Sequence, residues 1–261
     1  MDPLWTPKTP NKSAMAAFMR DVNSEFSTQF TDYHQLWKWS VENHEDFWTH
    51  WWNYINPIAS RQPNRALINA DLFERSRWFP EAELNFAENL LRFRDDKKAI
   101  VFRDEDGNRS SLTYNELAVI AGSVATELQN LGIGKGDRVA AILPNIPEAI
   151  IAMLATTWLG AVWSSCSPDF GTDGILERFK QIEPKLLFSC DGYKFKGTTY
   201  SILAKTHAVR NQLKCKTVMV NWLNIGKVSS TIDWKELTNS KAKSPKFNQI
   251  NFNDPVYILY S

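Results

Sequence analysis

The sequence has few of the residues that mark disulfide-stabilised and metal-binding proteins. Only three cysteines occur among 261 residues, Cys166, Cys190 and Cys215, and none lies close to another. Such spacing fits neither a disulfide framework nor a cysteine zinc site, so we expect reduced thiols. His44 and His50 are six residues apart, a spacing that does not align them on one helical face as metal ligands. We therefore expect no metal site.

Charge of one sign and long apolar runs are also lacking. The chain has 30 Lys and Arg residues against 29 Asp and Glu residues, a net charge of +1. No basic excess exists to replace the counterions of phosphate groups, which argues against a nucleic-acid-binding protein. No run of about 18 apolar residues is present, and residues 1–13 lack a signal-peptide core. We expect a cytoplasmic protein without membrane or nucleic-acid partners.

Tryptophan, by contrast, is abundant near the N-terminus. Of 11 tryptophans, six lie in the first 52 residues: Trp5, Trp37, Trp39, Trp48, Trp51 and Trp52. Apolar residues at helical spacing predict a helix within 15–26 and two more within 32–54, separated by a polar break at 42–44. We interpret this segment as an aromatic packing element rather than an aromatic cage or a base-stacking surface.

The stretch 137–171 predicts a βαβ unit. The apolar run 138–143 is typical of a strand buried in a parallel sheet. Asn145, with Glu148 three residues later, predicts the N-cap of a helix that ends at Gly160. A second strand then begins near residue 161 and leads into a polar loop, 164–171. Open α/β sheets bind ligands at the carboxyl ends of their strands, so this loop is a candidate site.

The rest of the chain from residue 98 alternates between strand and helix patterns. We expect a hairpin at 99–112, helices at 113–131, 172–183 and 200–213, strands at 185–190, 217–220 and 256–260, and an exposed polar excursion at 229–253. Thr113 and Glu116 predict a capping box, and Gly132 a helix end. This alternation predicts an α/β fold with a doubly wound parallel sheet, preceded by the aromatic-rich helical extension. The apolar run 256–260 predicts a central strand of that sheet.

Three motifs, in the expected order and spacing, resemble the adenylate-forming acyl-CoA synthetases. They are residues 112–117, 154–162 and 254–261, the last resembling the lead-in to a phosphate-binding loop. A finer resemblance, carried by 78–91 and 160–171 and supported by 191–197, is to the acetoacetate–CoA ligase family. Residues 32–58 are similar to the N-terminal extension of acetyl-CoA-type synthetases. The resemblance implies three parts: a lead and helix at 1–31, that extension at 32–92, and an incomplete ligase domain at 93–261.

The resemblance implies a two-step reaction. Acetoacetate and Mg·ATP give an acyl-adenylate and diphosphate, and the thiol of coenzyme A (CoA) then displaces AMP. The cofactors and substrates implied are ATP, CoA, Mg²⁺ and acetoacetate. Of the nucleotide-binding parts, only the start of the phosphate loop, Tyr260 and Ser261, falls within the chain. No catalytic residue of the family is implied here, so we expect the 261-residue chain alone to be inactive as a truncated form.

More of the family's CoA-binding residues than of its nucleotide-binding residues fall within the chain. The resemblance implies that Trp163, Ser164, Phe170 and Gly171 border the pantetheine tunnel. It also places Lys194 and Lys196 where relatives use arginines on the nucleotide phosphates. Plain packing of the tryptophan and solvated surface lysines are the competing interpretations. A nucleophilic role for Cys166 is not favoured, because no histidine lies nearby and the reaction needs no enzyme thiolate.

Other readings remain open from the sequence. The chain fits an acetate, propionate or other short-chain acyl-CoA synthetase, because the acyl pocket of the family lies mostly beyond residue 261. It also fits a non-catalytic CoA-binding module. Finally, a buried strand at 256–260 without later partners predicts self-association through an uncovered sheet edge.

Overall fold

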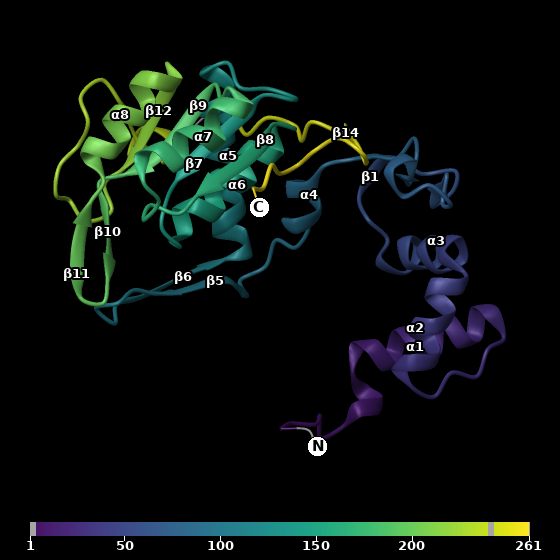
Figure 1. Cartoon of the computed structure of the whole chain (residues 1–261). Coiled ribbons are helices and arrows are strands. Elements are labelled where there is room, and N and C mark those ends of the chain that lie inside the picture. The colour runs from purple at the N-terminus through teal and green to yellow at the C-terminus, as the bar shows by residue number, and fades with distance from the viewer. Residues whose placement is uncertain (1–3, 240–242, 261) are drawn as a thin grey trace. The chain divides into compact units, whose positions relative to one another are not determined.

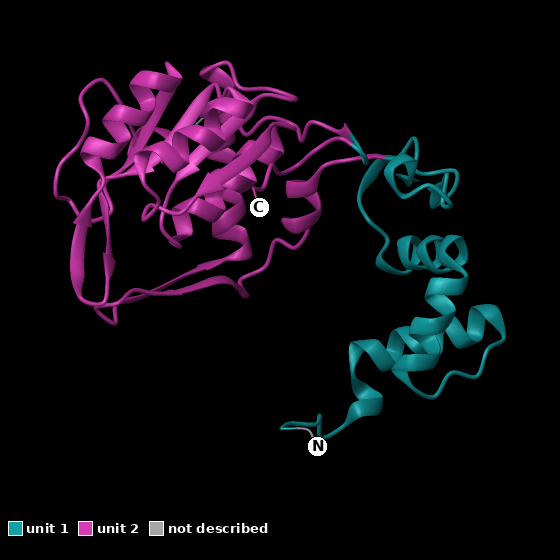
Figure 2. Ribbon diagram, in the orientation of Figure 1, with its two compact units in different colours: residues 1–82, 251–253 teal, residues 83–250, 254–261 magenta. Residues whose placement is uncertain are grey.

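The computed structural model describes residues 4–239 and 243–260. The chain divides into two compact units, residues 1–82 with 251–253 and residues 83–250 with 254–261 (Figure 1, Figure 2). The first unit includes residues 251–253 because this short segment near the C-terminus packs with residues of that unit. Within the described ranges, no helix combines the length and the hydropathy needed to cross a bilayer.

The first unit is built on helices. They are η1 (Pro10–Lys12), α1 (Ala14–Phe26), α2 (Tyr33–Glu42) and α3 (His44–Ile55). Ser13 caps α1 by accepting from the amide of Ala16, and Asp32 caps α2 by accepting from that of Gln35. Asn43 ends α2 and precedes α3, which confirms the break predicted at 42–44.

Aromatic side chains fill the interior of this helical unit. The buried ring of Phe18 meets Phe47, Trp51 and Tyr54 edge-on, with centroids 5.0–5.9 Å apart. Edge-to-face pairs of this kind add to the free energy gained from burial. The Nε2 atom of His50 lies 2.9 Å from a carboxylate oxygen of Asp21. These contacts support the packing interpretation of the aromatic segment.

Short strands complete the first unit. They are β1 (Ala59–Arg61), β2 (Leu67–Ile68) and β3 (Arg77–Trp78), with η2 (Phe73–Arg75) between β2 and β3. Strands β2 and β3 pair antiparallel. Asn253 joins the unit through its side chain, which accepts from the amide of Trp78 at 3.1 Å and donates to its carbonyl at 2.8 Å.

The second unit contains a five-stranded parallel sheet. Its strands are β7 (Arg138–Ile142), β8 (Val162–Cys166), β9 (Leu186–Cys190), β12 (Lys216–Val220) and β13 (Ile232–Asp233), in the order β13-β12-β9-β7-β8. Every neighbouring pair is parallel. Strand β9 is buried along its whole length and β7 from its second residue on, as continuous apolar runs require.

Helices cover both faces of this sheet (Figure 1). Helix α6 (Pro147–Trp158) carries the chain from β7 outward to β8, whereas α7 (Thr172–Ile182) and α8 (Leu203–Leu213) carry it back toward β9 and β12. Right-handed crossovers in opposite directions place α6 opposite α7 and α8. Helix α5 (Tyr114–Asn130) packs on α6, and α7 packs on α8. The doubly wound α/β fold is thereby confirmed.

Smaller elements surround the sheet. The hairpins are β5 (Lys98–Arg103) with β6 (Arg109–Thr113), and β10 (Gly192–Phe195) with β11 (Thr198–Ser201). The short elements are β4 (Glu83–Leu84), α4 (Phe86–Leu90), α9 (Trp234–Thr238) and β14 (Ile250–Asn251). Thr113 and Glu116 form the predicted capping box at the start of α5.

Two predictions around the βαβ unit were wrong in detail. Ile146, not Asn145, is the N-cap residue of α6, because Pro147 at the first helical position forces its predecessor into extended backbone. The polar loop begins later than predicted, since β8 pairs residue by residue with β7 as far as Cys166. Backbone pairing does not depend on side-chain polarity, so the serines at 164 and 165 belong to the strand. The loop therefore spans 167–171.

The region after β9 also differs from the prediction. A hairpin occupies 192–201, so α8 begins at Leu203 rather than at Tyr200. Its turn places Lys196 and Gly197 in left-handed backbone, with φ of 51° and 76°. Gly192 is required at its start, because a Cβ there would lie 2.5 Å from the carbonyl oxygen of Tyr200. Close approach of two backbone segments does not change the local pattern of apolar residues, so this hairpin was not predicted.

The polar region 229–253 is not merely an exposed excursion. It contains β13 and α9, and the side chains of Trp234, Leu237 and Ile250 are buried. Residues 240–242 lie outside the described ranges. Widely spaced apolar residues in a polar stretch are a weak signal. Trp234 and Leu237 become buried because α9 packs against α5 and β12, whereas Ile250 belongs to β14.

Residues 256–260 do not form a central strand. They lie beside β8, the outermost strand of the parallel sheet, through a single parallel bridge between Trp163 and Tyr257. The amide of Trp163 donates to Val256 at 3.0 Å, and its carbonyl accepts from Ile258 at 2.9 Å. Hydrophobicity indicated burial on both faces, yet the side chain of Leu259 is 81% exposed.

Candidate functional site

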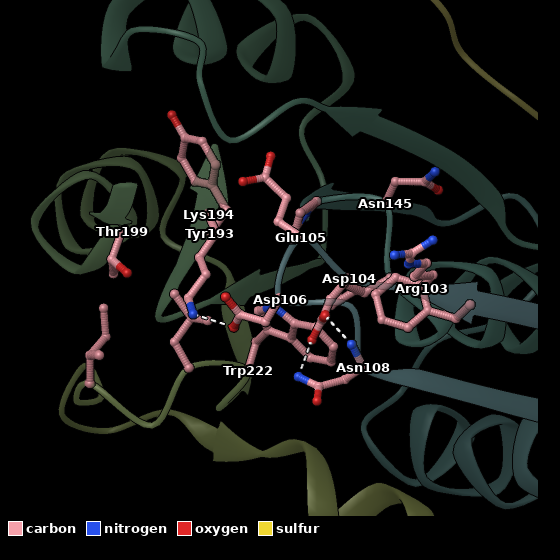
Figure 3. Close-up of a pocket in the computed structure, with 15 residues that line it drawn as sticks. Arg103, Asp104, Glu105, Asp106, Asn108, Asn145, Tyr193, Lys194, Thr199 and Trp222 are labelled. Carbon is pink, nitrogen blue, oxygen red and sulfur yellow. Dashed lines mark hydrogen bonds and ion pairs between the residues drawn. The ribbon is translucent and has the colours of Figure 1, made fainter. Parts of the chain in front are cut away.

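A cavity of about 680 Å³ opens at the carboxyl ends of β7, β9 and β12 (Figure 3). Asn145 follows β7, Tyr193 and Lys194 follow β9, and Trp222 follows β12. The helices after β7 and β9 leave toward opposite faces of the sheet, so the cavity lies at a topological switch point. Ligands of open α/β sheets bind at such points. The fold therefore marks this cavity as a candidate site.

The wall of the cavity is a contact between two hairpin turns, which meet in Figure 1 and in close-up in Figure 3. The ammonium group of Lys194 forms an ion pair with the carboxylate of Asp106, which raises the pKa of this lysine. The carboxylate of Glu105 accepts from the backbone amides of Lys196 at 3.2 Å and Gly197 at 3.0 Å. The acidic turn between β5 and β6 thus occupies the donors of the β10–β11 turn.

The acidic turn is itself ordered by hydrogen bonds. The carboxylate of Asp104 accepts from the backbone and side-chain nitrogens of Asn108, both at 2.8 Å, and these bonds lower the pKa of that carboxyl group. Among the cavity-lining residues, the carboxylates of Asp104, Glu105 and Asp106 outnumber the cations of Arg103 and Lys194. A phosphate group would be repelled here unless Asp106 released its lysine.

A second cluster lies around the loop 167–171, between β8 and α7. The guanidinium group of Arg178 stands 5.1 Å from the ring centroid of Phe170 and 5.9 Å from that of Tyr260. The Tyr260 hydroxyl donates to the Arg178 carbonyl at 3.1 Å, and burial raises the pKa of this tyrosine. The Ser164 hydroxyl donates to the carbonyl of Ile258 at 2.8 Å. Arg178 therefore joins the loop to the last described residue of the chain.

The structure brings together some of the residues singled out in the sequence and separates others. Phe170 and Tyr260 lie beside Arg178, the Ser164 hydroxyl contacts that of Tyr260 at 3.4 Å, and Gly171 is the N-cap of α7. The φ of Gly171, −64°, is one that any residue adopts. The position therefore does not require glycine for its backbone conformation.

Trp163, Lys194 and Lys196 make other contacts. Trp163 is 6% exposed, and its ring centroid lies 6.1 Å from that of Phe188 in the core, which supports the packing interpretation. Its side chain also lines a smaller cavity of about 430 Å³. The two lysines contact the β5–β6 turn, as described above. Ser261 lies outside the described residues.

The loop 167–171 follows the carboxyl end of β8, and the β10–β11 hairpin follows the carboxyl end of β9 in the same parallel sheet. Burial raises the pKa of Tyr193, and the negative charge of Asp169 in the loop raises it further. The ring of Tyr193 stacks on Tyr200 of β11 at 5.3 Å. Both clusters therefore lie at the same carboxyl edge of the sheet.

Sequence reasoning missed two side chains of this region, Arg178 and Lys205. Both lie inside helices, in α7 and α8, where the surrounding pattern indicates only which helix face is buried. Their partners are the ring of Phe170 and the backbone carbonyls of Pro168 and Phe170. A backbone carbonyl has no sequence signature, so only the packing of these helices identifies the contacts.

Cys166 is the last residue of β8 and lies next to the loop 167–171. Burial raises the pKa of Cys166, which disfavours the thiolate form. Among residues 4–239 and 243–260, no group of three His, Cys, Asp or Glu side chains is arranged to hold a metal ion.

Two family models match the chain. The model described as AMP-binding enzyme matches residues 86–261, and the model described as acetyl-coenzyme A synthetase N-terminus matches residues 33–90. Together they account for most of both units. The second match falls on the aromatic helices and the segment that follows them.

Individual relatives agree with these matches. The chain is 40% identical to an acetoacetyl-coenzyme A synthetase of Rhizobium meliloti (strain 1021) and 34% identical to an acetoacetyl-CoA synthetase of Gallus gallus, over 99% of its length in each case. It is 32% identical to a malonamoyl-CoA synthetase of Penicillium aethiopicum. The chain spans 41% of the first two relatives and 38% of the third.

A solved structure gives the same result. The acetoacetyl-CoA synthetase from Streptomyces lividans superposes with a TM-score of 0.93 and 33% sequence identity, covering all of this chain and 41% of the other. At this identity the likeness extends beyond the general fold. Because the AMP-binding enzyme model matches residues 86–261, well over half of the sequence, this chain belongs to the AMP-binding enzyme family.

Proposed function

We propose that the chain is the N-terminal portion of an acetoacetate–CoA ligase. Such an enzyme converts acetoacetate, ATP and CoA to acetoacetyl-CoA, AMP and diphosphate. The similarity to acetoacetyl-CoA synthetases over 99% of the chain carries this proposal. Within it, residues 32–92 serve as the N-terminal extension, and residues 93–261 form the first part of the ligase domain.

Adenylation needs a backbone cradle for the phosphates of ATP and a cation to neutralise the leaving diphosphate. We assign the start of that cradle to Tyr260 and Ser261. The Ser164 hydroxyl donates to the carbonyl of Ile258, just before this cradle, and the guanidinium group of Arg178 lies 5.9 Å from the ring centroid of Tyr260. Magnesium would supply the neutralising charge. Because the chain spans 41% of its relatives, we expect it not to catalyse adenylation by itself.

In this proposal the chain contributes more residues to the CoA-binding surface than to the phosphate cradle. We assign the loop 167–171 to this surface, together with Trp163 and Ser164 behind the loop. Phe170 is 40% exposed and offers an apolar face. Lys194 and Lys196 are assigned to the CoA phosphates. Because Asp106 already holds Lys194, phosphate and carboxylate compete for one ammonium group.

That competition gives a direct test of the lysine assignment. We expect Asp106→Asn to free Lys194 and to tighten CoA binding by about threefold to tenfold at low salt. Lys194→Met should weaken binding. Isothermal titration of the purified chain with CoA measures both effects, and CoA lacking its 3′-phosphate distinguishes the two kinds of phosphate. If Asp106→Asn and Lys194→Met shift the affinity in the same direction, Lys194 only joins the two hairpins and is not a phosphate ligand.

The reaction itself is tested by isotope exchange between diphosphate and ATP. Residues 1–261 can be joined to the C-terminal portion of the Rhizobium meliloti relative for this purpose. We expect acetoacetate-dependent exchange from this chimera and none above a no-protein control from the 261-residue chain. Exchange by the chain alone would refute its assignment as an inactive portion, and equal rates with acetate would refute the substrate.

One relative favours a second substrate. The malonamoyl-CoA synthetase of Penicillium aethiopicum is 32% identical to this chain over 99% of its length. Malonamate and acetoacetate both carry a carbonyl group two carbons from the carboxylate carbon. The same exchange assay with malonamate decides whether the enzyme takes short 3-carbonyl acids as a class or acetoacetate alone.

A further inference from the structure

We propose that Lys205 is a positioning residue, which holds the loop 167–171 in the conformation that receives CoA. The proposal rests on the proposed function for its ligand, but the hold on the loop rests on geometry alone. The ammonium group of Lys205 reaches from α8 and donates to the carbonyl oxygens of Pro168 and Phe170, both at 2.6 Å. One cation thus ties two carbonyls on either side of Asp169.

These two hydrogen bonds are stronger than those between neutral groups, because their donor is charged. Hydrogen bonds from a charged donor are shorter and stronger than neutral ones, and an ammonium group has three protons to donate. Within the loop, the amide of Phe170 donates to Ser167 at the long distance of 3.3 Å. The loop conformation therefore depends on a side chain that lies 35 residues or more away in sequence.

The backbone of Lys205 is held in place by the packing of α8 on the sheet. The next residue, Thr206, is fully buried, and its hydroxyl lies 2.6 Å from that of Ser189 on β9. Val209, one turn further along α8, is also fully buried. Partial burial lowers the pKa of Lys205, and the nearby carboxylate of Asp169 opposes that shift. A rigid helix and a half-buried cation together make Lys205 an anchor rather than a mobile surface lysine.

The loop is held from its other side by Arg178, whose guanidinium group lies over the ring of Phe170. The two cations act on different atoms of the loop. Lys205 fixes the backbone at positions 168 and 170, and Arg178 orients the exposed ring. Loss of Lys205 should therefore release the backbone while the fold of the sheet remains, because the loop contributes one buried residue, Pro168, to the interior.

The test compares three variants of the 261-residue chain. Lys205→Met removes the donors but keeps the apolar stem, and Lys205→Arg keeps a donating cation. Lys180→Met is the matched control, since Lys180 is an exposed lysine on α7 that bonds the side chain of Gln212. It removes the same charge from the helix next to α8. Amide hydrogen exchange at residues 169–172 and the CoA dissociation constant from isothermal titration are measured for each.

For Lys205→Met we expect amide exchange in the loop to accelerate about tenfold or more and the CoA dissociation constant to rise about tenfold. Lys205→Arg should recover much of both, and Lys180→Met should change neither. Loop exchange that stays at the wild-type rate in Lys205→Met overturns the proposal, whether or not CoA binds.

Two further outcomes separate this proposal from the proposed function. Faster exchange with an unchanged CoA dissociation constant overturns the positioning role, because the loop would then be held for some other reason. A wild-type chain that fails to bind CoA overturns both the proposed CoA surface and the role of Lys205 toward it. In that case the exchange rates still decide whether Lys205 holds the loop.

Discussion

Asn85 is a fully buried polar residue that joins three segments of the second unit. Its side-chain nitrogen donates to the carbonyls of Thr157 at 2.9 Å, Trp158 at 3.1 Å and Asn248 at 2.8 Å. Its side-chain oxygen accepts from the amide of Glu88 and caps α4. Buried polar groups are costly when left unpaired. Position 85 therefore requires a side chain that both donates and accepts hydrogen bonds, and not merely one of the right size.

We expect Asn85→Asp to lower the free energy of unfolding by about 3 kcal/mol or more, because a carboxylate would face three carbonyl oxygens. Asn85→Ala should cost about 2 kcal/mol, since it leaves those carbonyls unpaired but adds no charge. Urea unfolding followed by circular dichroism measures both. Asn211→Asp, an exposed site on α8, is the control. Equal midpoints for Asn85→Asp and this control would contradict the expectation.

The cysteines give a second prediction at the scale of residues. Burial raises the pKa of Cys190 to about 12 and that of Cys215 to about 11, so hardly any thiolate exists at neutral pH. We expect slow reaction of the folded chain with an aromatic disulfide reagent at pH 7.5. All three thiols should react promptly in denaturant. Prompt reaction of Cys190 in the folded chain, located by mass spectrometry, would show that the core around β9 opens readily.

At the scale of elements, the capping box of α5 gives a prediction with a defined pH dependence. The Glu116 carboxylate accepts from the amide of Thr113 at 2.8 Å and from its hydroxyl at 3.0 Å, and these bonds lower the pKa of Glu116. A lowered pKa in the folded state means that the stabilisation is complete above the ordinary carboxyl pKa. It is lost as pH falls below that value.

We therefore expect Glu116→Gln to reduce the drop in stability of the chain between neutral pH and about pH 3. Thr113→Ala, which removes the other half of the box, should cost about 1 kcal/mol at neutral pH. Urea midpoints measured across this pH range test both expectations. Glu177→Gln, an exposed change on α7, is the control and should keep the wild-type pH profile. Parallel profiles for Glu116→Gln and wild type would count against the capping contribution.

At the scale of the whole molecule, the edge beside β8 raises the question of self-association. Residues 256–260 pair with β8 on one side, and Leu259 is 81% exposed. Tyr257 is a poor site for a test, because its ring packs on Phe86 at 5.3 Å and its hydroxyl contacts the Met153 sulfur. Leu259 is the better choice, since its side chain faces outward.

We expect the 261-residue chain to associate at tens of micromolar, because an exposed apolar edge is a template for pairing with a second copy. Leu259→Lys should shift the equilibrium toward monomer by about tenfold, by adding charge at that edge. Sedimentation velocity over a range of concentrations measures both. A wild-type chain that stays monomeric throughout would show that the edge does not pair.

The local pattern of the sequence determined much of the fold. The apolar run of β7, the capping box of α5 and the polar break between α2 and α3 are each specified within a few residues. Backbone hydrogen bonding and side-chain periodicity act over that range, so such elements can be predicted locally. The family resemblance carried by residues 78–91 and 160–171 likewise agrees with the family model and the relatives that match the chain.

Tertiary structure alone decided which residues meet. Lys194 pairs with Asp106, and Lys205 holds the loop after β8, although these partners lie far apart in the chain. The run 256–260 has the composition of a central strand, yet it lies outside β8. Periodicity reports that a face is buried, but the partner is set by which element packs opposite. That choice depends on the packing of the whole domain, so the contacts of the candidate site follow from the folded structure.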